Sequence, residues 1–324
     1  MISNYILITL VGGIALSFLL ADPPNRIHPV SWLGKLVNYF MPKLKHKSSL
    51  KKERLKGIVF TLTLTFGISV ASYYSSVALY KIFGIFALLI YSLLVLKFTM
   101  AILTLERHVN AVTNALQEKN LIDARKKLSY IVGRKTEPLD REHIISATIE
   151  SIGESVVDGI GSPLFYYSLF GPSGAIAYRI INTLDSMIGY TDKYHYEIGW
   201  MAAKLDTISN YLPARLCGLL LVVSAKIVGA DWKNSILVMR MDHNNTPSRN
   251  GGYPMSALAG ALRVRLEKVG FYVLGTNIEP LSIEKCNNAL RMVKLSVILF
   301  LVFTLIPMVL LLSLIGWWDT LYGF

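Results

Sequence analysis

The sequence predicts an all-α, polytopic integral membrane protein with about four spanning helices and a large helical cytoplasmic region. The 324 residues are 53% hydrophobic and only 17% charged, which is too apolar for a typical soluble domain. Several apolar runs are long enough to cross a bilayer. The net charge is +12, but residues 41–56 alone hold seven Lys or Arg against one Glu. Such local basicity indicates membrane topology and argues against a nucleic-acid partner.

Four apolar runs are the predicted spans, and they cover residues 2–20, 57–80, 82–105 and 295–316. The first run follows no Lys or Arg and precedes no small-residue cleavage site, so we expect a retained span rather than a signal peptide. Only Lys81 separates the second run from the third. The fourth ends at Trp317 and Trp318, aromatic residues of the kind found at membrane boundaries.

The positive-inside rule places the basic loop at 41–56 in the cytoplasm and both chain ends outside. Residues 1–105 then form three N-terminal transmembrane helices, residues 106–293 a cytoplasmic helical catalytic region, and residues 294–324 a C-terminal transmembrane helix. We therefore expect a multi-pass protein of the cell membrane whose active site faces the cytoplasm. The apolar run at 216–229 is short for a span and contains Lys226, which favours a buried or re-entrant helix. A crossing there is the alternative, and it would place residues 230–293 on the far side.

The two cysteines, Cys217 and Cys286, lie far apart without a CxxC motif or a nearby His pair. Neither a disulfide framework nor a zinc site is indicated, so both are interpreted as packing residues.

A helix is predicted over residues 140–159, with Asp140 as its N-cap and Gly159 at its end. Helical spacing places Glu150, Glu154 and Asp158 on one face, opposite a row of isoleucines. Three carboxylates on one stripe repel one another unless a cation or basic groups lie between them, and Mg²⁺ would supply that charge. The alternative is an ordinary solvated helix face.

The segment NTLDSMIGY, residues 182–190, belongs to a second predicted helix on which Tyr178, Asn182 and Asp185 form a narrow polar stripe. The rest of that helix is apolar, so it should be largely buried, and a buried carboxylate needs a partner. A structural hydrogen bond to a neighbouring helix would also satisfy it.

A third helix, in residues 199–216, presents Asp206 and Asn210 beside Gly199 and Ala203 until Pro213 is expected to stop it. The small residues would let a backbone or a flat ligand come close. Flanking cations could bind phosphate or simply interact with the helix dipole; they are Lys204 and Arg215.

Two polar loops complete the candidate site. The first, residues 21–34, carries His28, and the second, residues 241–266, carries His243, Ser248, Arg249 and Asn250 ahead of a glycine pair. Glycine-rich turns that lead into a helix can cradle phosphate through backbone N–H groups, although flexibility alone would also explain the glycines. No Walker A, GxGxxG or HExxH pattern occurs in the sequence.

Five segments together resemble the CobD/CbiB family of integral membrane cobalamin-biosynthesis proteins. They are DPPNRIHPVSWLG, ESIGESVVDGIGSPLFYYSLFG, AYRIINTLDSMIGY, AAKLDTISNYLPARL and DHNNTPSRNGGYPMSALAGAL. They occur in the order and approximate spacing of that family, between about residue 18 and about residue 275. Several long motifs in fixed order form a specific signal.

The resemblance implies adenosylcobinamide-phosphate synthase activity, a carbon–nitrogen ligase reaction. Adenosylcobyric acid, a corrinoid, would be joined through a propionate carboxylate to aminopropanol phosphate or a related amino alcohol phosphate, with ATP hydrolysis and Mg²⁺. An acyl phosphate or an adenylate would be the activated intermediate. The lipid bilayer and other cobalamin-assembly membrane enzymes are the remaining expected partners.

The candidate residues follow from these patterns and from the resemblance. Metal binding or general-base catalysis is expected of the carboxylates Glu150, Glu154, Asp158, Asp185 and Asp206, with the first four as Mg²⁺ ligands. Substrate or phosphate binding is expected of His28, Arg134, Asn182, Lys204, Asn210, Arg215, His243, Ser248, Arg249 and Asn250.

Two other functions fit the residue patterns. An Mg²⁺-dependent membrane transferase acting on a diphosphate lipid also places acidic residues at helical spacing near the cytoplasmic surface. A non-catalytic membrane scaffold for corrinoid enzymes would use the same stripes structurally, and Glu154→Gln or Asp185→Asn would then leave its function intact.

Overall fold

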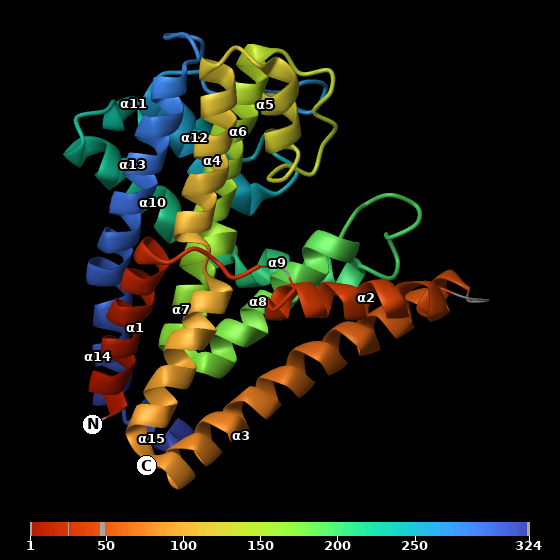
Figure 1. Ribbon diagram of the computed structural model, residues 1–324, viewed down its shortest axis with the longest axis vertical. Helices are drawn as coiled ribbons and strands as arrows, with labels where there is room; N and C mark the ends of the chain where they lie inside the picture. The colour runs from red at the N-terminus through yellow and green to blue at the C-terminus, as the bar shows by residue number, and fades with distance from the viewer. Residues whose placement is uncertain (1, 25, 46–48, 323–324) are drawn as a thin grey trace. The chain divides into compact units, whose positions relative to one another are not determined.

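The computed structural model describes residues 2–24, 26–45 and 49–322, and nearly all of its regular structure is helical (Figure 1). The chain forms two compact units, each assembled from separate stretches of sequence. The first unit contains residues 1–101, 162–210 and 305–324, and the second contains residues 102–161 and 211–304. The basic segment predicted at 41–56 lies partly outside the described residues, because 46–48 are not among them.

The first unit is built from helices only among its described residues. These are α1 (Ile2–Leu19), α2 (Pro29–Lys45), α3 (Leu50–Thr99), α7 (Ser162–Phe170), α8 (Pro172–Ile188), α9 (Trp200–Ser209), α14 (Ile306–Leu314) and α15 (Trp317–Tyr322).

Helix α3 is a folded-back pair of helical arms. Its backbone is interrupted at Gly84, where φ is 79° and ψ is −172°, a conformation that glycine adopts without the clash a Cβ would cause. Figure 1 shows the orange ribbon of α3 turning back at this end. Two helices were predicted with Lys81 between them, so the reversal is confirmed, with the break three residues later.

Two helical stretches are long and apolar enough to cross a membrane, Leu50–Gln117 and Ile283–Leu314. A bent pair, Trp200–Ser209 with Tyr211–Ile227, would be a third span if it is counted as one. Helix α1 is apolar but shorter, with Asn4–Leu19 as its apolar part. The described residues therefore contain two to three candidate spans.

The core of the first unit holds α2 against α8. Val37 and Met41 of α2 are buried with Ile180, Leu184 and Ile188 of α8. Burying side chains of this size stabilises the contact by roughly 1.5–3 kcal/mol each. The packing fixes the rotation of α8, and with it the direction of its polar stripe.

The second unit adds a small sheet to a set of helices. Its elements are α4 (Ile102–Gln117), α5 (Leu121–Leu128), α6 (Arg141–Val156), the π-helix η1 (Val157–Gly161), α10 (Tyr211–Ile227), α11 (Trp232–Asp242), α12 (Arg249–Leu262), β1 (Leu266–Lys268), β2 (Tyr272–Leu274), α13 (Ile283–Phe300) and most of η2 (Leu301–Leu305).

Strands β1 and β2 form an antiparallel hairpin that the all-α prediction omitted. Leu266 pairs with Leu274 and Lys268 with Tyr272, and Gly270 turns the chain with φ at 77°. Alternating side chains on either side of a glycine are typical of such a hairpin. The prediction of an exclusively helical fold is therefore wrong for this segment.

Two predicted helix ends differ from the structure. Asp140 caps α6 as expected, by accepting a hydrogen bond from the His143 N–H at 2.9 Å, but Gly159 lies inside η1 and does not end the helix. Pro213 does not stop a helix either, because α9 ends at Ser209 and α10 begins at Tyr211. In the first turn of α10 the missing proline N–H costs no helical hydrogen bond.

Cys217 and Cys286 are both buried and unpaired with each other. Their interpretation as packing residues is confirmed.

Candidate functional site

In the second unit, the buried side chain of Glu150 is the centre of a polar cluster. Arg134 Nη2 lies 3.2 Å from both Glu150 carboxylate oxygens. The Tyr272 hydroxyl donates to Glu150 Oε2 at 2.7 Å, and the Ser146 hydroxyl donates to Oε1 at 2.8 Å. Every oxygen of this buried carboxylate therefore has a partner, as burial of a charge requires.

Local structure explains how these groups meet. Ser146 precedes Glu150 by one turn of α6, so the two side chains lie on one face. The hairpin brings Tyr272 to the same face, and the backbone N–H of Glu267 donates to Ser146 Oγ at 2.8 Å. The cluster thus depends on docking of the β-hairpin against α6.

Glu154 lies one turn beyond Glu150 and has a different environment. Its side chain remains solvent-accessible, and among the described residues it has no hydrogen-bond partner. Surrounding protein atoms displace water and raise its pKa; the negative charge of Glu150 raises it further, while Lys268 and Arg134 oppose the shift. A carboxylate with a raised pKa is a better proton acceptor near neutral pH.

Asp158 falls in η1 rather than in the α-helix that carries the other two carboxylates. A π-turn holds more residues than an α-turn, so the simple four-residue stripe is shifted at this point. Throughout the described part of the chain, no group of three or more His, Cys, Asp or Glu side chains is arranged to hold a metal ion.

The N-terminus of α12 lies beside Glu154. A Cβ on Gly251 would be 3.6 Å from the Glu154 Cγ atom. Ser248 is the N-cap and accepts from the Gly251 N–H at 3.4 Å. Gly252 is explained by packing, because a Cβ there would lie 2.0 Å from the His243 carbonyl oxygen.

Aromatic rings surround the predicted phosphate binder Arg215. Its guanidinium carbon lies 3.5 Å from the ring centroid of Tyr211 and 4.6 Å from that of Tyr253. Asn250 is buried, with its Oδ1 atom 3.5 Å from Arg215 Nη1. The His243 ring packs against Tyr253 and is bonded to the Met239 carbonyl. Arg249 is exposed at the start of α12.

A second cluster of carboxylates and amides belongs to the first unit. Asn210 Nδ2 donates to Asp206 Oδ2 at 3.0 Å, and Asn182 Nδ2 lies 3.5 Å from Oδ1. The Asn210 side-chain oxygen accepts from Tyr178 at 2.8 Å and from Ser162 at 2.6 Å. The stripe predicted on α8 therefore meets the stripe predicted on α9.

The side-chain carboxylate of Asp185 has no hydrogen-bond partner among the described residues. Burial raises its pKa to about 7, and the neighbouring Asp206 carboxylate contributes to the rise. Gly189 allows this arrangement, since a Cβ there would lie 2.0 Å from Asp185 Oδ1. Asp185 can consequently change its protonation state near neutral pH.

His28 is half-buried near a set of charged groups in the first unit. Burial lowers its pKa, and the positive charges of Arg179 and Lys97 act in the same direction while Asp22 opposes them. Lys97 and Asp22 form an ion pair at 2.6 Å. Lys204 lines a separate cavity of about 200 Å³ with Tyr190, Tyr196 and Trp200.

The structure thus places the predicted residues in two sets. Glu150, Glu154, Asp158, Arg134, Arg215, His243, Ser248, Arg249 and Asn250 belong to the second unit, and His28, Asn182, Asp185, Lys204, Asp206 and Asn210 to the first. The sequence interpretation missed two members of the Glu150 cluster, Ser146 and Tyr272, and it also missed Lys268, whose charge acts on Glu154. Recognition of the hairpin pattern around Gly270 could have identified the last two.

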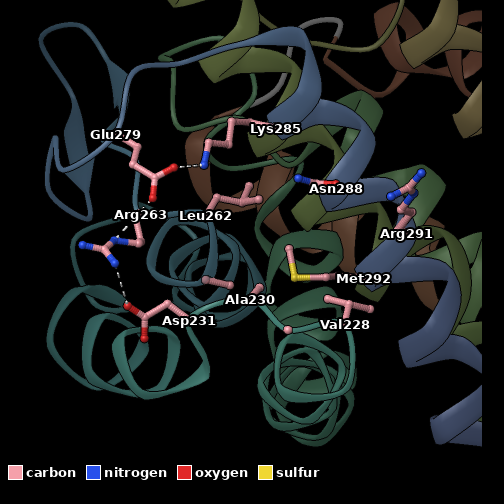
Figure 2. A pocket seen from close by; sticks show the side chains of 12 residues that line it. Val228, Ala230, Asp231, Leu262, Arg263, Glu279, Lys285, Asn288, Arg291 and Met292 are labelled. Carbon is pink, nitrogen blue, oxygen red and sulfur yellow. Dashed lines mark hydrogen bonds and ion pairs between the residues drawn. The ribbon is translucent and has the colours of Figure 1, made fainter.

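A cavity of about 420 Å³ in the second unit is lined by several charged side chains, and among the described residues all of them except Arg291 pair with one another (Figure 2). Arg263 lies 3.8 Å from Asp231 and 3.5 Å from Glu279, and Glu279 also pairs with Lys285. The two carboxylates of this cavity, Asp231 and Glu279, are therefore both held in ion pairs. The unpaired carboxylate of Glu154 is the stronger candidate for proton transfer.

Comparison with known proteins decides the family. The family described as CobD/Cbib protein matches residues 10–315. The chain belongs to the CobD/CbiB family.

Individual relatives in this family cover nearly the same length. A protein of Methanothermobacter thermautotrophicus named "Probable cobalamin biosynthesis protein CobD" is 38% identical over 90% of this chain and 94% of its own. A Methanococcus maripaludis protein of the same name is 36% identical over 87% and 92%. The "Cobalamin biosynthesis protein CobD" of Clostridium perfringens is 34% identical over 89% and 94%. No solved structure matches the chain.

Proposed function

We propose that this protein is an adenosylcobinamide-phosphate synthase of cobalamin biosynthesis. It would join the propionate carboxylate of adenosylcobyric acid to the amino group of aminopropanol phosphate or a related amino alcohol phosphate. Membership of the CobD/CbiB family supports a place in cobalamin assembly. The observation that carries the chemical proposal is the accessible, unpaired Glu154 with its raised pKa.

Amide formation needs two operations for which the second unit has suitable groups. ATP converts the unreactive carboxylate into an acyl phosphate with release of ADP, or into an adenylate with release of pyrophosphate. The amine, an ammonium ion in water, must lose a proton before it attacks. Glu154 accepts that proton, the C–N bond forms, and phosphate or AMP leaves.

Cationic side chains near the α12 N-terminus fit the phosphate groups of these substrates. Lys268 and Arg134 lie close enough to influence the Glu154 charge, and Arg215 and Arg249 flank Asn250. Guanidinium groups and helix N-termini are both favourable for phosphate oxygens.

The carboxylates fit a magnesium ion that arrives with ATP better than a resident all-protein metal site. Glu150 is already bonded to Arg134, Tyr272 and Ser146, whereas the exposed Glu154 side chain has no hydrogen-bond partner among the described residues. Mg²⁺ commonly takes one or two carboxylates together with substrate phosphates. When bound, it would neutralise charge on the phosphates during transfer.

We further propose four spans, with α1 and both arms of α3 as the first three and the helix ending at Leu314 as the fourth. The exposed apolar faces of α1 and α3 support this assignment; Ile8, Phe66 and Ile90 are examples. The positive-inside rule then turns the Glu150 cluster and the Asp206 cluster toward the cytoplasm. Within the first unit, the amides of Asn182 and Asn210 beside Asp206 are the groups proposed to contact substrate.

An assay of the purified protein in detergent tests the function. Adenosylcobyric acid, ATP, Mg²⁺ and aminopropanol phosphate should yield the amide product, and ADP or AMP identifies the activated intermediate. We expect Glu154→Gln to lower kcat by roughly 10²–10⁴-fold, the usual contribution of a general base. The exposed Glu142 on the same helix supplies a matched control, and Glu142→Gln should keep normal activity. Absence of amide product under every metal condition would refute the synthase assignment.

A further inference from the structure

Helix α2 carries a stripe of aromatic and lysine side chains on its exposed face. Trp32, Lys35, Tyr39 and Lys43 recur at intervals of three or four residues, which places them on one side of the helix. Trp32 is 54% and Tyr39 61% exposed. The Lys43 ammonium lies 3.5 Å from the Tyr39 ring centroid. The opposite side of α2, with Val37 and Met41, is packed into the core.

The cations around α2 divide into two groups. One group is used by the fold: Lys45 pairs with Glu53 at 3.4 Å, and Arg54 lies 3.9 Å from Glu197. The other group consists of exposed lysines without an anionic partner among the described residues: Lys35, Lys43, Lys51 and Lys52. The positive-inside rule accounts for a surplus of charge here but not for its alignment with aromatic rings.

The lysine and aromatic face of α2 lies next to the exposed apolar surfaces of α1 and α3, which are suited to contact with lipid. Helix α2 follows the apolar helix α1 and runs across its direction (Figure 1). Immediately after Lys51 and Lys52, α3 exposes Leu55, Val59 and Phe66, within a stretch long and apolar enough to cross a membrane. Cations and aromatic rings at the end of such a stretch occupy the headgroup level of a bilayer.

We propose that the exposed face of α2, together with Lys51 and Lys52, is a binding surface for anionic phospholipid headgroups. The four lysines contact lipid phosphates, while Trp32 and Tyr39 lie among the headgroups with their ring bodies toward the acyl chains. A soluble protein partner would not require lipid-type apolar surface beside the cations. The proposal is independent of the catalytic activity.

Helix α2 packs against α8, the helix that carries part of the Asp206 cluster. The inner face of α2 contacts Ile180, Leu184 and Ile188, and α8 carries Asn182 and Asp185 between those residues. Lipid bound to the outer face therefore restrains α8 and its polar stripe.

The test measures lipid binding to the full-length protein without substrates. Native mass spectrometry of the detergent-solubilised protein compares retained phosphatidylglycerol with phosphatidylcholine, and hydrogen exchange in nanodiscs follows the α2 and α8 peptides. The test variant replaces four lysines by glutamine: Lys35, Lys43, Lys51 and Lys52. A control with the same change in charge replaces Lys119, Lys126, Lys135 and Lys233.

We expect the wild type and the control to prefer phosphatidylglycerol, and the test variant to bind it at least about tenfold more weakly. Arginine at the four positions should restore binding, since only the charge is needed. Soluble glycerol phosphate should not displace the lipid, which separates a membrane-surface site from a free-phosphate site.

Equal retention of the two lipids by the wild type would overturn the proposal. So would an equal loss in the control variant, or protection of α2 only on self-association of the chain. Loss of amide synthesis alone would leave it intact, because no substrate is present in the measurement.

Discussion

Asp185 and Asp206 are neighbouring carboxylates of the first unit that differ in their hydrogen bonding. Asp206 is satisfied by the amides of Asn182 and Asn210, whereas Asp185 has burial and a neighbouring negative charge but no donor. The free energy of ionising Asp185 is therefore unfavourable in the folded protein. Its ordinary pKa of 3.8 rises to about 7, which makes folding sensitive to pH.

The sign of that sensitivity follows from proton binding. Between about pH 4 and about pH 7 the folded state holds a proton on Asp185 that the unfolded state has lost, so the free energy of unfolding falls as pH rises. Asp185→Asn cannot ionise. We expect this variant to be more stable than the wild type by about 1–3 kcal/mol near pH 8, and the difference should shrink as the pH falls and be small near pH 4.

Thermal unfolding in detergent across this pH range measures the effect, and the surface change Glu118→Gln serves as the control. If Asp185 takes part in substrate binding, the same variant loses amide synthesis while gaining stability. A variant that becomes less stable at high pH would show that the carboxylate is needed by the fold.

At the scale of elements, the hairpin and α6 form the Glu150 cluster jointly. Tyr272→Phe removes one hydroxyl from a buried carboxylate while keeping the ring. A hydrogen bond to a charged group contributes about 1.5–3 kcal/mol, so we expect a Tm lower by several degrees. We also expect a lower kcat/KM, since the Glu150 charge influences Glu154.

The comparison variant for this prediction is Tyr130→Phe, because Tyr130 is 60% exposed. Thermal unfolding measures the Tm of both variants and steady-state kinetics measures their kcat/KM, and only Tyr272→Phe should lower the two values. An unchanged Tm in Tyr272→Phe would mean that the hairpin does not hold Glu150.

Local patterns predicted the helices far better than the contacts between distant segments. The cap at Asp140, the stripe of Asn182 and Asp185, and the reversal between the arms of α3 all follow from spacing within one turn or one run. Tyr272 and Glu150 are 122 residues apart, and no local pattern specifies that pair. The clash of a Cβ at Gly252 with the His243 carbonyl is likewise visible only in three dimensions.

At the scale of the whole molecule, the chain order and the compact units do not coincide. The chain leaves the first unit at residue 101, returns at 162, leaves again at 210 and returns at 305. Hydropathy along the sequence distinguishes apolar from polar stretches, so it predicted three consecutive regions, 1–105, 106–293 and 294–324, rather than two interleaved units. It has no information on which polar stretch packs with which apolar one.

The proposed topology makes a prediction about reporters fused to truncated chains. A reporter after Leu237 should be active in the cytoplasm, whereas one after Lys81 should be active outside, because an odd number of spans separates the two positions. Phosphatase activity and the fluorescence of a fluorescent protein, each fused at the same positions, report the side of the membrane on which each position lies. An exterior signal at Leu237 would mean that the α10 segment crosses the bilayer.

The burial of Cys217 and Cys286 has a practical consequence for such work. Both native thiols are shielded from water, so water-soluble maleimides should leave the folded wild type unlabelled. Engineered single cysteines at surface positions can then carry spin labels or fluorophores without first deleting the native thiols. Distances between the two units thereby become measurable in the intact, unmutated core.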